Sequence, residues 1–224
     1  MKVVYLKGLS TNKEELDFIK NKFESEGIYF INLVDDYSEF YNKSREEVCE
    51  IIGQRIHNLT WQSEPVTLVC HSMGCNYGLL VGPNPLFLIK NVVFISPEFK
   101  KITKEERDNI VESTNAITRE PAQMKFGINK LKNIRTFIQS SKWVDGALDN
   151  YLNSEMGPKF TTILYSKGDK YVSREIINKM AECRNIKSYE VDTNNHNPLL
   201  EDTNCIDIIK QETENVYNGL HSLK

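Results

Sequence analysis

The sequence lacks the patterns that mark exported, membrane-spanning and nucleic-acid-binding chains. Its five cysteines are odd in number and form no C-x-x-C pair, so they indicate neither a disulfide framework nor a zinc knuckle. Only four consecutive apolar residues, 3–6, precede Lys7, too few for a signal peptide or a membrane span. The net charge is −3, without a long basic run. We therefore expect a cytoplasmic protein with no nucleic-acid partner, no stable membrane insertion, and no metal or other cofactor.

Short apolar runs alternate with amphipathic helical patterns along most of the 224 residues. A chain of this length can bury about 70% of its unfolded surface in one core. Strands that are apolar throughout bury both faces, which is typical of a parallel sheet covered by helices on both sides. We therefore predict an α/β fold with a doubly wound, mainly parallel six-stranded sheet. The predicted strands are 3–6, 28–34, 66–70, 92–95, 161–165 and 188–191, and the predicted helices are 11–25, 44–59, 72–81, 174–182 and 205–217.

Residues 100–160 do not follow this alternation. They show helical patterns, for example Leu131, Ile134, Phe137 and Ile138, but no convincing strand. The stretch is also longer than an ordinary crossover connection. We predict one domain, 1–224, in which 100–160 is a helical cap insertion.

Ser72 stands where the third apolar run meets a predicted helix, in Cys-His-Ser-Met-Gly. A serine hydroxyl is a weak nucleophile and needs a base, which is in turn oriented by an acid. The sharp turn that exposes such a serine requires small residues two positions before and after it, and Cys70 and Gly74 meet that requirement. Ligands of parallel sheets bind beyond the carboxyl ends of the strands, where this serine lies. Ser72 is therefore a candidate nucleophile.

This segment resembles the nucleophile elbow, G-x-S-x-G, of the α/β-hydrolase superfamily, with cysteine in place of the first glycine. Residues 162–172 look like the family's strand, glycine, aspartate and hydrophobic stop. Residues 195–201 look like its G-H-x-P-x-x-E segment, with asparagine in place of the glycine. The resemblance implies that Ser72 is the nucleophile, Asp169 the acid and His196 the base.

The amino end carries a further similarity to this family. Lys7-Gly8-Leu9 resembles the H-G-x that follows the family's third strand, with lysine in place of the histidine. The resemblance implies that the backbone N–H groups of Leu9 and Met73 form an oxyanion hole. If the first strand here corresponds to the family's third, a minimal six-stranded sheet follows.

The implied function is that of a serine hydrolase that cleaves a small-molecule carboxylic ester or thioester through an acyl-enzyme on Ser72, under helices from 100–160. An acyltransferase would use the same three residues. A catalytically silent protein that binds a small ligand or a partner is the other alternative, motivated by Lys7, Cys70 and Asn195. The acyl chain, the leaving group and the oligomeric state stay open.

Several neighbouring residues have alternative interpretations. Glu98 is an alternative acid, because some family members carry the carboxylate after the preceding strand, and Asp192 is a weaker candidate. His71 is expected to point away from the nucleophile, in a structural or pocket-lining role. Cys70 and Cys75 are expected to be small packing residues, since no further metal ligand occurs at usable spacing.

Overall fold

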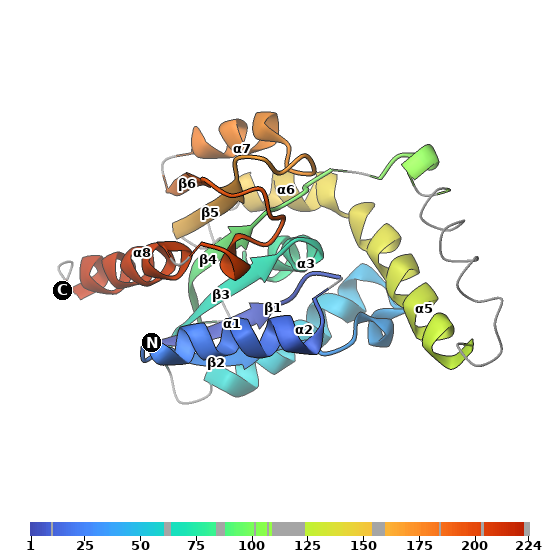
Figure 1. The fold of residues 1–224 in the computed structure, drawn as a ribbon, viewed down its shortest axis with the longest axis horizontal. Helices are drawn as coiled ribbons and strands as arrows, with labels where there is room; N and C mark the ends of the chain where they lie inside the picture. The colour runs from blue at the N-terminus through green and yellow to red at the C-terminus, as the bar shows by residue number, and fades with distance from the viewer. Residues whose placement is uncertain are drawn as a thin grey trace.

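The structure, a computed structural model, describes most of the chain (Figure 1). The described residues are 1–9, 11–60, 64–83, 88–100, 102–106, 108, 124–153, 160–183, 185–202 and 204–221. Much of the predicted cap, including 109–123 and 154–159, therefore lies outside the described residues.

Six strands form one sheet in the order β2-β1-β3-β4-β5-β6, and every neighbouring pair is parallel. The strands are β1 (Lys2–Leu6), β2 (Tyr29–Asn32), β3 (Val66–His71), β4 (Ile89–Ile95), β5 (Phe160–Ser166) and β6 (Ile186–Val191). β3 lies near the centre and is buried at all its positions, as its mainly apolar sequence predicts. The predicted six-stranded α/β fold is confirmed.

Helices cover both faces of this sheet (Figure 1). They are α1 (Lys13–Ser25), α2 (Arg45–Thr60), α3 (Met73–Val81), α5 (Met124–Ser141), α6 (Val144–Asn153), α7 (Arg174–Ala181) and α8 (Asn204–His221), with 3-10 turns η1 (Tyr37–Phe40) and η3 (Pro198–Leu200). Buried residues of α1 and α8 pack against the strand side chains on one face of the sheet. Buried residues of α2, α3, α6 and α7 pack against the alternate strand side chains, which point to the other face. The sheet is therefore doubly wound.

Capping boxes fix the starts of α1 and α2. The Asn12 side chain accepts the Glu15 N–H at 2.9 Å, and the Glu15 carboxylate accepts the Asn12 N–H at 3.2 Å. The Ser44 side chain accepts the Glu47 N–H at 3.1 Å, and the Glu47 carboxylate accepts the Ser44 N–H at 2.6 Å. Each box satisfies two backbone donors that a helix start leaves without a partner.

The described part of 100–160 is helical and contains no strand before β5. α6 buries Val144, Ala147, Leu148 and Tyr151 in the cluster that also holds α3. The Tyr151 hydroxyl lies 2.8 Å from Oγ1 of Thr161 on β5. α6 thus packs on the sheet like an ordinary crossover helix, whereas α5 packs against η1 and α3. The extent of a cap stays a prediction.

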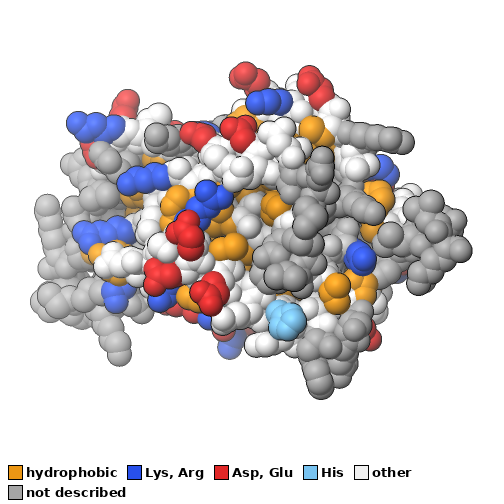
Figure 2. Space-filling view, turned by 180° about the vertical axis from the view of Figure 1, so that it is seen from behind, with side chains coloured by type: hydrophobic (Ala, Val, Ile, Leu, Met, Phe, Trp, Pro, Cys, Tyr) orange, Lys and Arg blue, Asp and Glu red, His pale blue; other side chains and the backbone are white. Residues whose placement is uncertain are grey.

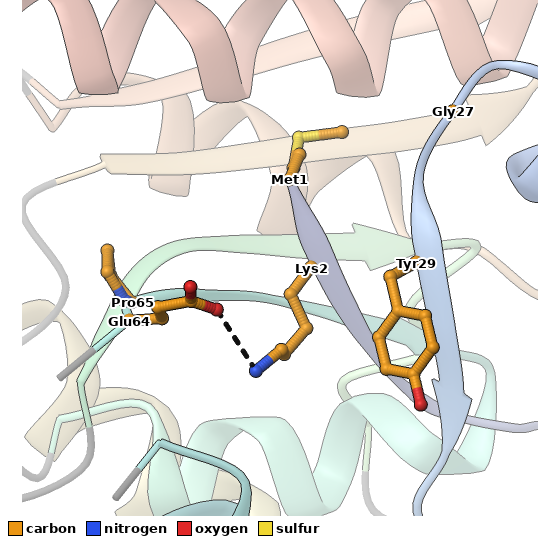
Figure 3. Close-up of a pocket in the computed structure, with 6 residues that line it drawn as sticks. All are labelled: Met1, Lys2, Gly27, Tyr29, Glu64 and Pro65. Atoms are coloured by element: carbon orange, nitrogen blue, oxygen red, sulfur yellow. Dashed lines mark ion pairs between the residues drawn. The ribbon is translucent and has the colours of Figure 1, made fainter. Parts of the chain in front are cut away.

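The surface carries both signs of charge, and the described residues include no helix long and apolar enough to cross a membrane. Figure 2 shows acidic and basic side chains next to one another on one face. A hollow of about 450 Å³ lies at the amino ends of β1 and β2 (Figure 3), where Lys2 and Glu64 form an ion pair of 3.3 Å. It is lined by none of the predicted site residues, which follow the opposite ends of the strands.

The start of α3 lies against the end of β1, and Gly74 makes this approach possible. A Cβ atom on Gly74 would lie 2.1 Å from the carbonyl oxygen of Leu6 and 2.9 Å from that of Lys7. Both contacts are with backbone atoms, which cannot rotate away as the end of a side chain can. Only glycine lets the two elements meet here, and this contact places Ser72 directly beyond β3.

We expect Gly74→Ala to lower the melting temperature by roughly 2–12 °C. Overpacking costs about 1–3 kcal/mol, and each kcal/mol corresponds to about 2–4 °C in a chain of this size. Gly146→Ala is the matched control, because a Cβ on this exposed residue of α6 meets nothing within 4 Å. Alanine there should raise the melting temperature slightly. Scanning calorimetry that gives equal midpoints for the two variants would contradict the close contact.

Candidate active site

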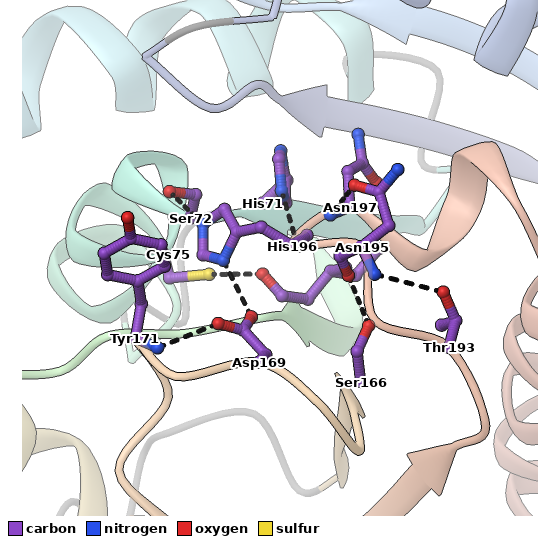
Figure 4. Close-up of polar contacts among 11 residues, drawn as sticks. His71, Ser72, Cys75, Ser166, Asp169, Tyr171, Thr193, Asn195, His196 and Asn197 are labelled. Atoms are coloured by element: carbon purple, nitrogen blue, oxygen red, sulfur yellow. Dashed lines mark hydrogen bonds and ion pairs between the residues drawn. The ribbon is translucent and has the colours of Figure 1, made fainter.

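The three side chains predicted to act together lie in one line (Figure 4). Ser72 directly follows β3, Asp169 follows β5, and His196 follows β6. The Nδ1 atom of His196 lies 2.7 Å from Oδ2 of Asp169, and its Nε2 atom lies 2.9 Å from Oγ of Ser72. Because parallel strands end at one edge of the sheet, residues far apart in the sequence meet there.

Ser72 sits on a strained turn. Its φ of 51° and ψ of −119° are unusual for a residue other than glycine, and such conformations cost about 1–3 kcal/mol. Two hydrogen bonds hold the turn: the Ser72 N–H donates to the Ile95 carbonyl and the Cys75 N–H donates to the Ser72 carbonyl, each at 2.9 Å. The turn thereby directs the Ser72 hydroxyl toward His196 and leaves it out of the cap of α3.

Asp169 is held as a carboxylate. Its side chain is only 1% exposed, and Oδ1 accepts the Tyr171 N–H at 2.9 Å while Oδ2 faces His196. Burial on its own would raise the pKa of Asp169. The hydrogen bonds from His196 and from the Tyr171 N–H outweigh it and hold the pKa below its usual value. The ionised carboxylate can only accept, so Nδ1 of His196 carries the proton in this contact.

Two aromatic side chains flank His196. The centre of the Tyr171 ring lies 5.4 Å from that of His196, nearly edge-on, and the residue is 48% exposed. The His71 ring lies at the same distance on another side. The sequence analysis missed both contacts of Tyr171, the one from its N–H to Asp169 and the one from its ring to His196. The first had a usable signal, because Tyr171 lies two residues after Asp169 and an aspartate often accepts that N–H in an Asx turn.

Asn195, which stands where the α/β-hydrolase pattern has glycine, makes hydrogen bonds within the loop that carries His196. The Asn195 side chain accepts the Asn197 N–H at 2.9 Å and donates to Glu201 at 3.0 Å. The carbonyl of Asn195 accepts a hydrogen bond from the Ser166 hydroxyl. This departure from the family pattern therefore has a structural role in the loop and leaves His196 in place.

Two hydrogen bonds hold the loop after β1. Lys7 donates from Nζ to the Thr11 carbonyl at 3.4 Å, and its own carbonyl accepts the Tyr37 hydroxyl at 2.8 Å. Burial lowers the pKa of Lys7. The lysine side chain thus folds back along its own loop.

This loop approaches Ser72. A Cβ atom on Gly8 would lie 3.3 Å from Cβ of Ser72. Leu9 follows directly, and Met73 is the first residue of α3, where backbone N–H groups have no acceptor within the helix. An oxyanion hole made by the N–H groups of Leu9 and Met73 remains a prediction.

Cys70 and Cys75 lie in the core, as expected of packing residues. The Cys75 thiol donates to the carbonyl oxygens of Cys70 at 3.2 Å and Ile95 at 3.5 Å. Burial raises the pKa of both thiols, which disfavours the reactive thiolate. Within the described part of the chain, no group of three or more His, Cys, Asp or Glu side chains is arranged to hold a metal ion.

The geometry favours Asp169 over both alternative acids. Glu98 follows β4 and is partly buried, and burial raises its pKa. The carboxylate within hydrogen-bond distance of His196 Nδ1 is that of Asp169. Asp192 is 97% exposed and lies 3.9 Å from Lys167.

No family model and no curated protein matches this sequence. Solved structures match it in fold. A lipase-esterase related protein from Clostridium acetobutylicum is 19% identical with a TM-score of 0.66, over 94% of this chain and 93% of its own. An alpha/beta hydrolase enzyme from the metagenome of lagoon sediments of Mar Chica, Morocco, is 17% identical with a TM-score of 0.65, over 97% and 92%. A structure from a study of carboxylesterases of the thaumarchaeon Nitrososphaera gargenis is 12% identical with a TM-score of 0.68, over 97% and 91%. The six-stranded parallel sheet and these likenesses together show that the chain has the α/β-hydrolase fold.

Proposed function

We propose that this protein is a serine hydrolase that cleaves a small-molecule carboxylic ester or thioester through an acyl-enzyme on Ser72. The observation that carries the proposal is the line of hydrogen-bond contacts from Asp169 through His196 to Ser72, at 2.7 and 2.9 Å. A serine that only capped α3 would bond to the helix, but the Ser72 side chain makes no such bond.

Asp169 determines how His196 acts. Because Nδ1 keeps its proton and donates a hydrogen bond to the Asp169 carboxylate, Nε2 presents a lone pair to the Ser72 hydroxyl. Nε2 removes the hydroxyl proton as Ser72 attacks the substrate carbonyl, and it then delivers that proton to the departing alcohol or thiol. Water attacks the acyl-enzyme with the same help from His196 and releases the acid. Asp169 stays ionised and stabilises the imidazolium that forms in both steps.

The negative charge on the substrate oxygen needs donors that are already oriented. In this proposal the backbone N–H groups of Leu9 and Met73 supply them. The close approach of the loop at Gly8 to Ser72 supports that role. Each such donor contributes about 10²–10³ in rate in comparable acyl-transfer enzymes.

The departures from the family pattern do not favour a silent binding protein. Lys7 turns back to the Thr11 carbonyl, and Asn195 stabilises its own loop. Cys70 is buried beside Gly78, where a Cβ atom would lie 2.6 Å from its sulfur. None of the three side chains interrupts the line to Ser72.

We expect a fluorophosphonate probe to label the wild type and not Ser72→Ala, since the probe reacts only with an activated serine. Ser25→Ala is the control, because this exposed serine lies at the end of α1. In-gel fluorescence measures the labelling, and p-nitrophenyl esters and acyl thioesters measure turnover. A folded wild type that takes no label would support the silent binding protein. Turnover that depends on an added alcohol or amine would support the acyltransferase.

Asp169→Asn should lower kcat by about 10⁴-fold, because an amide at this position favours the wrong imidazole tautomer. Asp192→Asn, at an exposed position, should leave kcat unchanged. Steady-state kinetics measures the kcat of both variants, with whichever p-nitrophenyl ester or acyl thioester the wild type turns over. Retention of more than a tenth of the wild-type kcat by Asp169→Asn would remove Asp169 from the acid role.

Glu98→Gln should keep kcat within about threefold and change the dependence of stability on pH. A carboxyl whose pKa is raised by burial is favoured in its neutral form in the folded state, so it destabilises the fold as the pH rises above the ordinary glutamate pKa of about 4.3. Glutamine is neutral throughout. The gain in melting temperature over wild type should therefore be larger at pH 8 than at pH 4. A large loss of kcat would instead move the acid role to Glu98.

A further inference from the structure

His71 is buried beside the candidate site, and the proposed mechanism does not use it. The side chain comes from the last residue of β3, directly before Ser72, and the residue is 3% exposed. The alternation of strand side chains predicts that it points away from Ser72. Figure 4 shows His71 and Asp169 on different sides of His196.

The His71 ring contacts the main chain of the proposed base. Its Nε2 atom lies 3.3 Å from the carbonyl oxygen of His196. A carbonyl oxygen can only accept, so Nε2 carries a hydrogen. The hydrogen bond therefore fixes the position of the backbone from which the His196 imidazole extends.

The other ring nitrogen faces the loop after β1. A Cβ atom on Gly8 would lie 2.7 Å from Nδ1 of His71, so the ring limits how this loop can lie. Nδ1 is buried, and no described residue shares a hydrogen bond with it. A proton on Nδ1 would therefore be a buried donor without an acceptor, whereas a bare lone pair costs less.

The surroundings of the ring thus favour a neutral imidazole with its proton on Nε2. The titratable groups that act on it are His196 and Asp169, and burial lowers the pKa of His71 to about 3. Neutrality matters for its neighbour. A positive charge 5.4 Å away would oppose protonation of His196, which the proposed mechanism requires in both steps.

We propose that His71 is a positioning residue that, as a neutral imidazole, holds the His196 backbone above Ser72 and sets the place of the loop at Gly8. This inference deepens the proposed function, on which its kinetic consequence rests. The contacts themselves hold whether or not Ser72 reacts, so they can be tested separately.

The first test is independent of activity. In ¹⁵N-labelled wild type, two-bond imidazole correlations report the tautomer, and the His71 signals are assigned by their loss in His71→Gln. We expect the Nε2–H tautomer without titration between pH 5 and 9. A proton on Nδ1, or titration within this range, would overturn the proposal.

The second test compares two variants. His71→Gln keeps a neutral donor near the position of Nε2, whereas His71→Leu has none. The Nδ1–H proton resonance of His196, which reports its contact with Asp169, should shift in the leucine variant and stay near its wild-type position in the glutamine variant. Equal spectra of the two variants would refute the positioning role. If the leucine variant does not fold, the tautomer and pH behaviour of the wild-type ring decide the matter.

The kinetic readout separates positioning from general loss of structure. His71→Leu should lower kcat by about 10²-fold with KM within about threefold, since small displacements of a base cost about this much. His71→Gln should restore kcat to within about fivefold of wild type. His57→Leu, which removes an exposed histidine of α2, is the control and should match wild type. A leucine variant that melts with wild type and keeps its kcat would refute the proposal. An unlabelled Ser72 would end the proposed function, while the spectra would still decide the state of His71.

Discussion

The close contact between α3 and β1 is the constraint on which the site depends. Gly74 lets the helix start within van der Waals reach of the Leu6 and Lys7 carbonyls, and any side chain would force the two elements apart. The same contact fixes the strained turn at Ser72 and brings the loop at Gly8 near it. The strain at Ser72 persists because the packing on both sides of the turn leaves it no alternative.

The electrostatics of the site depend on which groups can hold charge. Hydrogen bonds keep Asp169 ionised despite its burial, whereas burial keeps His71 neutral and raises the pKa of Glu98. The proposed base, His196, therefore has one charged partner in direct contact.

Structural neighbours at 17% and 19% identity share nearly the full length of the fold, but they do not determine the chemistry of this chain. The hydrogen-bond contacts that join Asp169, His196 and Ser72 are what support the proposed enzyme. Positions at which the chain departs from the family pattern, such as Lys7 and Asn195, acquire local hydrogen bonds of their own. These bonds lie within the loops and leave the contacts among Ser72, His196 and Asp169 intact.

The sequence by itself determined the α/β alternation and the three motifs around Ser72, Asp169 and His196, because periodicity and turn chemistry are encoded within a few residues. Only the tertiary structure decided that α6 joins the core, that Asp169 rather than Glu98 contacts His196, and that His71 contacts the His196 backbone. Those contacts join residues that are distant along the chain. They depend on strand order and on the directions of side chains at one edge of the sheet, which no local pattern specifies.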